Sequence, residues 1–333
     1  MSSSKLLVVT GITGNQGSSV ANIFLQVPGW HIRGITRDTS SVAAQTWIAK
    51  DVELVKADLD NVTSLEHAFS GASAIFAVTD FWSHFFNPAN TLKAKEAGLS
   101  INEYARDLEI AQGMNMALAA SSPGVLSTLT HYVFSSLSDT KARSQGKYTW
   151  NFHFDGKASV TQRIRAELPG LAAKLSTVQI GMYTSNWKLG LGRPHKQGDG
   201  SFLVPIPEGD ERRLPWIVVR RDTGVFVKAL LQKEPGRHVL GSSAMATFSE
   251  FWMLWADIKG VKIEIAELPL GEYFKSLPEP ARKEMQDSLS YIREFGYTGS
   301  DPEVGILADL ALEGKTTSLR EYIASEDWSS LLA

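Results

Sequence analysis

Two residues whose types suit acid–base chemistry stand four positions apart, His153 and Lys157, where the helix-like segment 156–168 begins. A spacing of four places two side chains on the same face of an α-helix. The ordinary pKa of a histidine, about 6.5, suits it to give up a proton near neutral pH. Tyr148 and Tyr183 are alternative proton donors. The plainer alternatives are a hydrogen-bonded structural histidine and a solvated helix lysine.

A glycine-rich turn follows the first apolar run of the chain. In LLVVTGITGNQGSSVANIF, Gly11, Gly14 and Gly17 separate a strand-like segment from a helix-like one. Glycine adopts tight-turn angles cheaply, and its missing Cβ lets the backbone approach a pyrophosphate. The amides at the start of the next helix would then face the phosphate oxygens. The turn therefore predicts a dinucleotide site, and a strand-to-helix turn without a ligand is the alternative.

The end of the second predicted strand indicates which dinucleotide fits. In GITRDTSS, Arg37 comes directly after the strand and Asp38 follows it. A guanidinium suits the 2′-phosphate of NADP, whereas an acid at this point grips the 2′-hydroxyl of NAD. Arg37 therefore predicts NADP(H), with a surface ion pair to a nearby acid as the alternative.

Short apolar segments alternate with helix-like segments over the first half of the chain. The predicted strands are 5–11, 30–37, 52–59, 72–80, 130–137 and 175–183, and the main predicted helices are 17–27, 62–71, 101–121 and 156–168. Strands that are joined by helical crossovers pair in parallel with right-handed connections. We therefore predict an α/β fold with a doubly wound parallel sheet of the Rossmann type.

The regular alternation stops after residue 183. Segment 189–216 is rich in Gly and Pro and predicts loops with one short strand. Segment 247–260 predicts a helix, because Thr247 and Glu250 have capping-box spacing and Gly260 is placed to end it.

These patterns predict two unequal parts. We expect an NAD(P)-binding domain over 1–183, to which 217–242 returns. We expect a smaller, irregular lobe for a substrate or partner, made of 184–216 and 243–333. The polar segment 136–147 adjoins the predicted site and is expected to act as a lid.

Composition excludes several classes of function. The 333 residues carry a net charge of −3 without a basic cluster, which argues against direct nucleic-acid binding. The absence of cysteine rules out disulfides and thiolate metal sites, and the seven histidines lack ligand spacing, so we expect no metal site. The sequence contains neither a signal-peptide pattern nor an apolar run of membrane-spanning length. We expect a cytoplasmic protein, with the nucleus left open for a regulator.

Several segments together match a known pattern. They are TGITGNQGSSVA, TRD, VKADLDNVTSLEHAFSGASAIFAVTDFW, EIAQGMNMALAA, HYVFSSLSD and HFDGKASV. The chain thereby resembles the NmrA-like family of atypical short-chain dehydrogenases, which bind NADP in a Rossmann domain. The resemblance is strong over residues 5–187, and HFDGK and VTDFW are more specific to it than the glycine turn.

The resemblance implies which residues hold the cofactor. The glycine turn would wrap the pyrophosphate, Arg37 would hold the 2′-phosphate, and Lys157 would contact the nicotinamide ribose. The full expected set is Gly11, Thr13, Gly14, Asn15, Gln16, Gly17, Arg37, Asp58, Leu59, Thr79, Ser135, Lys157, Gly181, Met182 and Tyr183. One departure is Ala111, where some relatives carry a lysine.

Two functions remain open at this point. Ordinary short-chain dehydrogenases place a tyrosine four residues before the lysine, where this chain has His153. The chain is expected to be an NADPH-dependent oxidoreductase for a small apolar or aromatic carbonyl, imine or enone, with His153 and Lys157 as its catalytic pair. The alternative is a non-catalytic NADP(H) redox sensor that binds a regulatory protein. The family contains members of both kinds.

Aromatic residues favour the enzyme. Phe81 and Trp82 follow the fourth predicted strand, Trp150 precedes His153, and Trp187 follows the sixth strand. Ligands of open α/β sheets bind at the carboxyl ends of the strands, so these four aromatic residues are expected to form an apolar substrate pocket. The alternative is that large aromatic residues fill the core between the two parts.

Overall fold

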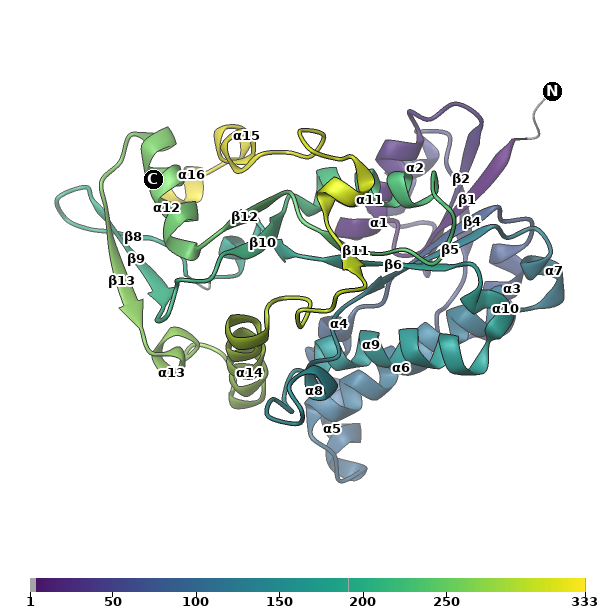
Figure 1. The fold of residues 1–333 in the computed structure, drawn as a ribbon, viewed down its shortest axis with the longest axis horizontal. Coiled ribbons are helices and arrows are strands. Elements are labelled where there is room, and N and C mark those ends of the chain that lie inside the picture. Colours follow the sequence, from purple (N-terminus) through teal and green to yellow (C-terminus); the bar gives the residue numbers. More distant parts are fainter. Residues whose placement is uncertain (1–3, 191, 333) are drawn as a thin grey trace.

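The main sheet has eight strands, all parallel, and is the centre of the larger part of the molecule (Figure 1). The computed structural model describes residues 4–190 and 192–332. The strands in spatial order are β14 (Val304–Gly305), β11 (His238–Gly241), β6 (Leu175–Ile180), β5 (His131–Ser136), β4 (Ala74–Ala77), β1 (Lys5–Val9), β2 (Trp30–Thr36) and β3 (Glu53–Lys56). This order reverses direction between β4 and β1, and it confirms the predicted doubly wound α/β fold.

Helices cover both faces of this sheet (Figure 1). One face carries α1 (Asn15–Phe24), α2 (Val42–Ile48) and α11 (Val219–Leu230), and the other carries α3 (Val62–Phe69), α6 (Ile101–Ala120) and α9 (Phe152–Glu167). Short helices fill the connections: α4 (Phe81–Phe85), α5 (Pro88–Glu96), α7 (Pro123–Leu126), α8 (Thr140–Arg143) and α10 (Pro169–Ala172). Of the helices in the described ranges, none is both long and apolar enough to cross a membrane.

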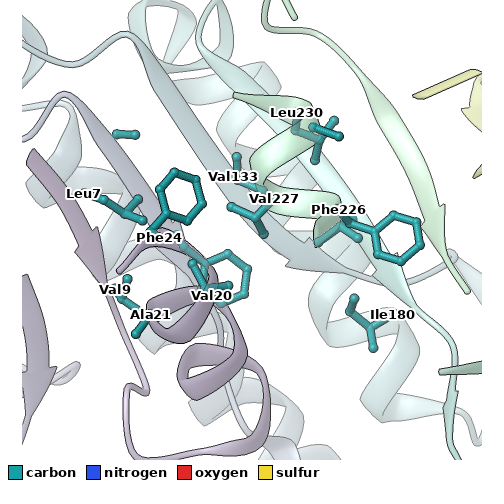
Figure 2. Close-up of a cluster of buried hydrophobic side chains, with 14 of the residues drawn as sticks. Leu7, Val9, Val20, Ala21, Phe24, Val133, Ile180, Phe226, Val227 and Leu230 are labelled. Atoms are coloured by element: carbon teal, nitrogen blue, oxygen red, sulfur yellow. The ribbon is translucent and has the colours of Figure 1, made fainter. Parts of the chain in front are cut away.

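The central strand β1 is apolar on both faces because each face is covered. Leu7 and Val9 pack against α1, where Val20 and Phe24 meet them (Figure 2). Val8 packs into the core on the opposite face. A strand buried on both faces reads as a continuous apolar run, which is what the start of this chain shows.

Parts of the chain distant in sequence complete the main sheet. Helix α11 packs on α1 where Gly224 meets the backbone of Ser19, and β11 adds beside β6. We expected 243–333 to lie wholly in the smaller lobe. Residues 304–312 lie instead at the outer edge of the main sheet, where Leu310 and Leu312 join its core.

The smaller lobe contains two three-stranded sheets and several helices (Figure 1). One sheet joins β12 (Ala244–Ala246), β10 (Leu214–Ile217) and β7 (Met182–Tyr183), and the other joins β13 (Ile263–Leu268), β9 (Phe202–Pro207) and β8 (His195–Lys196). The helical segments of this lobe are η1 (Asn186–Leu189), α12 (Phe248–Lys259), α13 (Leu270–Tyr273), α14 (Glu279–Phe295), α15 (Leu319–Ser325) and α16 (Ser329–Leu332). The short helix η2 (Leu307–Leu310) packs instead at the edge of the main sheet.

One prediction for this lobe is confirmed and one is wrong. Helix α12 begins with the predicted capping box of Thr247 and Glu250 and ends at Gly260 with φ of +65°. Segment 189–216, however, contains β8, β9 and most of β10 rather than one short strand. Strands β12 and β13 from later in the chain pair with β10 and β9, and β9 in turn pairs with β8.

The turn between β1 and α1 depends on one close approach. A Cβ on Gly17 would overlap the carbonyl oxygen of Gly11 and lie 2.7 Å from that of Thr10. Both obstacles are backbone atoms, which cannot rotate away as a side chain can. Gly17 therefore lets the start of α1 lie directly against the turn.

We expect Gly17→Ala to lower the free energy of unfolding by about 3 kcal/mol, because the backbone overlap has no cheap relief. Gly124→Ala is the matched control, because a Cβ there meets open space in helix α7. The control should leave stability unchanged or slightly raised. Equal stability of the two variants in urea unfolding would contradict the packing described for Gly17.

Candidate functional site

A cleft of about 1430 Å³ runs along the carboxyl ends of the strands of the main sheet and continues into the smaller lobe. Every residue expected from the sequence to hold the cofactor lines it, from Gly11 at the end of β1 to Tyr183 beyond β6. His153 lines it too, as do three of the four predicted aromatic residues, Phe81, Trp82 and Trp187. The fourth, Trp150, does not.

The end of the cleft at the glycine turn has the features of an anion-binding site. Helix α1 begins at Asn15 after the N-cap residue Gly14, no side chain caps it, and its first turn holds no acidic residue. The free amides of a helix start, together with its partial positive charge, favour a phosphate. The Gly17 contact holds this helix start against the Gly11 turn.

Arg37 stands exposed at the cleft where β2 ends. It has no ion pair or hydrogen bond with any residue that the structure describes, so the alternative of a structural surface pair does not apply. The Asp38 carboxylate instead accepts hydrogen bonds from the amide and the hydroxyl of Ser40, at 2.8 and 2.5 Å, and these bonds lower its pKa. The strand end thus presents a guanidinium to the cleft, and not a carboxylate.

Lys157 lies in the middle of the cleft within a closed set of hydrogen bonds. Its ammonium donates to Glu109 Oε1 at 2.6 Å, to Thr79 Oγ1 at 2.8 Å and to the Thr79 carbonyl at 2.9 Å. The Thr79 hydroxyl in turn donates to Glu109 Oε1. The three acceptors use all three ammonium protons, so Lys157 joins α9 to α6 and to the end of β4.

Glu109 was missed by the sequence reasoning. Its carboxylate has no exposed surface, and its Oε2 has no hydrogen-bond partner among the described residues. The only available signal was a charged residue in EIAQGMNMALAA, a segment that otherwise packs on the sheet. Ala111, where some relatives carry lysine, is exposed and lies outside the cleft, which Gln112 lines instead.

His153 lies beside the cleft one helical turn before Lys157. Its Nδ1 is 2.7 Å from Glu284 Oε1, a carboxylate that α14 contributes from the smaller lobe. The rings of Phe81, Trp82 and Phe154 surround the imidazole, with centroids at 6.0, 5.3 and 4.9 Å. The side chain keeps 14% of its surface exposed.

The two tyrosines that were alternative proton donors lie in different places. Tyr183 lines the cleft, accepts a hydrogen bond from Gln16 Nε2 at 3.0 Å, and has its pKa raised by burial. Tyr148 lies outside the cleft and donates to Glu294 at 2.8 Å. Of the two hydroxyls, only that of Tyr183 belongs to a residue lining the cleft.

The far end of the cleft is apolar and aromatic, and the smaller lobe supplies most of it. Its lining residues there are Trp187, Trp216, Phe248, Phe251, Trp252, Tyr273, Phe274, Leu277, Met285, Leu289 and Ile292. Phe251 and Trp252 also join the core of the lobe, so aromatic residues fill the core and line the cleft together. Trp150 lies elsewhere: its ring packs against that of Phe152, with centroids 5.5 Å apart, and the Lys283 ammonium lies 3.6 Å from the centre of its ring.

The segment expected to be a lid is anchored instead. Residues 136–147 include helix α8, which Asp139 caps, and only Ser136 and Leu137 line the cleft. The Ser138 and Tyr291 hydroxyls are hydrogen-bonded at 2.6 Å, and Arg143 pairs with Asp301. The polar composition of this segment could not predict these tertiary contacts, because their partners lie more than 150 residues later in the chain.

Comparison with known proteins settles the family. The model of the NmrA-like family matches residues 3–323. The chain belongs to the NmrA-like family. It is 33% identical to the NmrA-like family domain-containing oxidoreductase himF of Aspergillus japonicus over 317 residues, which cover 90% of this chain and 87% of the relative. It is 26% identical to oxidoreductase FrzB of a Cladobotryum species over 330 residues, covering 94% and 91%.

Solved structures of similar fold include a regulator and a reductase. NmrA, a negative transcriptional regulator crystallised with NADP, has a TM-score of 0.68 at 19% identity and covers 98% of this chain and 97% of its own. Triphenylmethane reductase of Citrobacter sp., complexed with NADP(H), has a TM-score of 0.65 at 18% identity and covers 96% and 98%. At these identities the similarity establishes the fold.

We expect Glu109→Leu to lower the free energy of unfolding by about 3–5 kcal/mol, because it leaves the Lys157 ammonium buried without its carboxylate. Glu167→Ala is the control, since Glu167 belongs to the exposed pair with Arg163 and its loss should scarcely change stability.

A double variant sharpens the same test. Lys157→Met combined with Glu109→Leu removes both charges and should recover most of the lost stability. A small effect of Glu109→Leu alone, with no recovery in the double variant, would contradict a buried and coupled pair.

Proposed function

We propose that the protein is an NADPH-dependent oxidoreductase that reduces a carbonyl, imine or enone group of an apolar or aromatic small molecule. The observation that carries this proposal is the continuity of the cleft. It runs from the glycine turn and Arg37 past Lys157 and His153 to an aromatic end in the smaller lobe. Its volume of about 1430 Å³ exceeds the roughly 300–1,000 Å³ of an ordinary small-molecule site, which leaves room for a second molecule beside a dinucleotide.

The residues of the cleft fit NADP(H). The uncapped start of α1 and the Gly11–Gly17 turn suit the pyrophosphate, and the unpaired Arg37 suits the 2′-phosphate. The NADP(H) complex of triphenylmethane reductase supports the same choice, whereas NmrA has been crystallised with NADP and with NAD and supports a dinucleotide site of either kind. When bound, this cofactor supplies a hydride from its nicotinamide ring.

Two residues of the chain take different roles in this proposal. We assign Lys157 a positioning role, since its three protons are already bonded within the protein and hold Thr79 at the wall of the cleft. We assign His153 the role of proton donor. Its Nε2 makes no hydrogen bond to any described residue, so it is free to protonate the substrate oxygen or nitrogen and to recover a proton from water.

The names of the relatives support an enzyme. Both himF and FrzB are described as oxidoreductases. The likeness to NmrA, a transcriptional regulator, supports the redox-sensor alternative. The aromatic lining of the cleft beyond Lys157 and His153 favours the enzyme, because a sensor that binds only the dinucleotide needs no such extension of the cleft.

We expect Arg37→Ala to weaken NADPH binding about 10- to 100-fold in isothermal titration, the scale of a lost charge-assisted contact. NADH binding should change little, because NADH has no 2′-phosphate. Asp38→Ala is the control and should weaken neither, since Asp38 is bonded to Ser40. Equal weakening of both nucleotides by Arg37→Ala would contradict recognition of the 2′-phosphate.

We expect the protein to oxidise NADPH in the presence of some members of a panel of aromatic ketones, enones and cyclic imines, followed by the loss of NADPH absorbance. A panel of short aliphatic aldehydes is the control and should react much more slowly, because it leaves the aromatic end unfilled. Tight, selective NADPH binding without oxidation by any compound would overturn the enzyme and support the sensor.

A further inference from the structure

Three nitrogen atoms lie within hydrogen-bond distance of the carboxylate of Glu284, in helix α14 of the smaller lobe. Its Oε1 accepts from the backbone amide of His153 at 2.9 Å and lies 2.7 Å from His153 Nδ1. Its Oε2 accepts from Asn102 Nδ2 at 2.8 Å. Glu284 and Asn102 both have 0% exposed surface. A carboxylate buried this completely needs such donors, and here one of them is an imidazole beside the cleft.

The orientation of each partner follows from what surrounds it. The Asn102 amide also donates to the carbonyl of Pro280 at 3.2 Å, so its NH₂ group must face two acceptors. Both oxygens of Glu284 therefore already accept an N–H. An ionised carboxylate can only accept, so His153 Nδ1 must bring its own proton to the bond. The neutral imidazole is then the Nδ1–H tautomer, whose second nitrogen, Nε2, carries no proton.

The aromatic neighbours hold the ring in this orientation. Phe81, Trp82 and Phe154 pack around the imidazole, and a half-turn of the ring would break the bond to Glu284. Nε2 has no hydrogen-bond partner within the described part of the chain, and His153 lines the cleft. The side chain is thus fixed at one nitrogen and available at the other.

We propose that Glu284, held by Asn102, is the positioning residue that sets the tautomer and the direction of His153 for proton donation into the cleft. This inference rests on the proposed oxidoreductase function. The doubly protonated imidazole gives its Nε2 proton to the substrate oxygen or nitrogen while hydride adds to the neighbouring carbon. The Nδ1–H bond to Glu284 persists throughout, and water returns the Nε2 proton.

Residues from both parts of the molecule are needed to hold the proton donor in place. His153 comes from α9 and Asn102 from α6, whereas Glu284 comes from α14, more than 130 residues later in the chain. Neither part alone holds the imidazole in place.

The test reads the tautomer of His153 by ¹⁵N NMR of imidazole-labelled protein without cofactor or substrate, with His153→Ala assigning the resonance. We expect the Nδ1–H tautomer in the natural protein and its loss in Glu284→Gln. A glutamine amide cannot accept at both oxygen positions of the carboxylate, so one N–H must go unbonded. Asp287→Asn is the matched control: Asp287 also lies on α14 and accepts from the Thr149 and Trp150 amides, but does not line the cleft.

Kinetics complete the test. We expect Glu284→Gln to lower kcat at least about tenfold, and by no more than the roughly 10²–10⁴-fold that a positioned acid contributes in full, with the Kd for NADPH unchanged. The unchanged Kd shows that the cleft is folded, and Asp287→Asn should retain both kcat and the tautomer. An Nε2–H tautomer in the natural protein, or a normal kcat in Glu284→Gln, would overturn the positioning role. Failure of the natural protein to turn over any substrate would instead overturn the proposed function, whatever tautomer is found.

Discussion

A carboxylate with no access to water constrains the centre of this protein. Glu109 projects from α6 into the interior, and a buried charge persists only when a partner of opposite charge and enough donors surround it. Lys157 supplies the charge, and Thr79 supplies the further hydrogen bond. These groups come from α6, from α9 and from the residues that follow β4. Their hydrogen bonds therefore fix the two helices and the carboxyl end of β4 relative to one another. Thr79 and Lys157 line the cleft, so these bonds also fix the wall of the cleft at that point.

A second buried carboxylate, that of Glu284, is surrounded by donors from the same two helices, α6 and α9. Asn102 lies seven residues before Glu109 on α6, two turns away on one face, and His153 lies four residues before Lys157 on α9. Each buried carboxylate therefore meets one residue of the α9 pair, Glu109 from within the main domain and Glu284 from the smaller lobe. Residues of the main domain form the half of the cleft that contains the glycine turn. Residues of the smaller lobe form most of the aromatic half. Proteins that share this fold can differ in function for that reason, since the second half is where their sites can diverge.

Local sequence was sufficient wherever a feature depends on neighbours in the chain. The buried strands, the Gly11–Gly17 turn and the capping box at Thr247 were all predictable, because burial period, missing Cβ atoms and cap spacing are local properties. Long-range partners were not. The sequence around Glu109 gives no sign that Lys157 is its partner, and the sequence around His153 gives no sign of Glu284. Segment 189–216 gained its extra strands from pairing with later residues, and Trp150 contacts Lys283 of α14, more than 130 residues away in the chain.

The central claim is that one continuous cleft holds a dinucleotide at the glycine turn and leaves its aromatic end open for a second molecule. A crystal structure of the protein grown with NADP⁺ tests it most directly. We expect the 2′-phosphate to lie against Arg37, the pyrophosphate to lie at the start of α1, and space to remain between the nicotinamide ring and the aromatic residues of the smaller lobe. An empty groove, a 2′-phosphate remote from Arg37, or an aromatic end closed by its own side chains would contradict it.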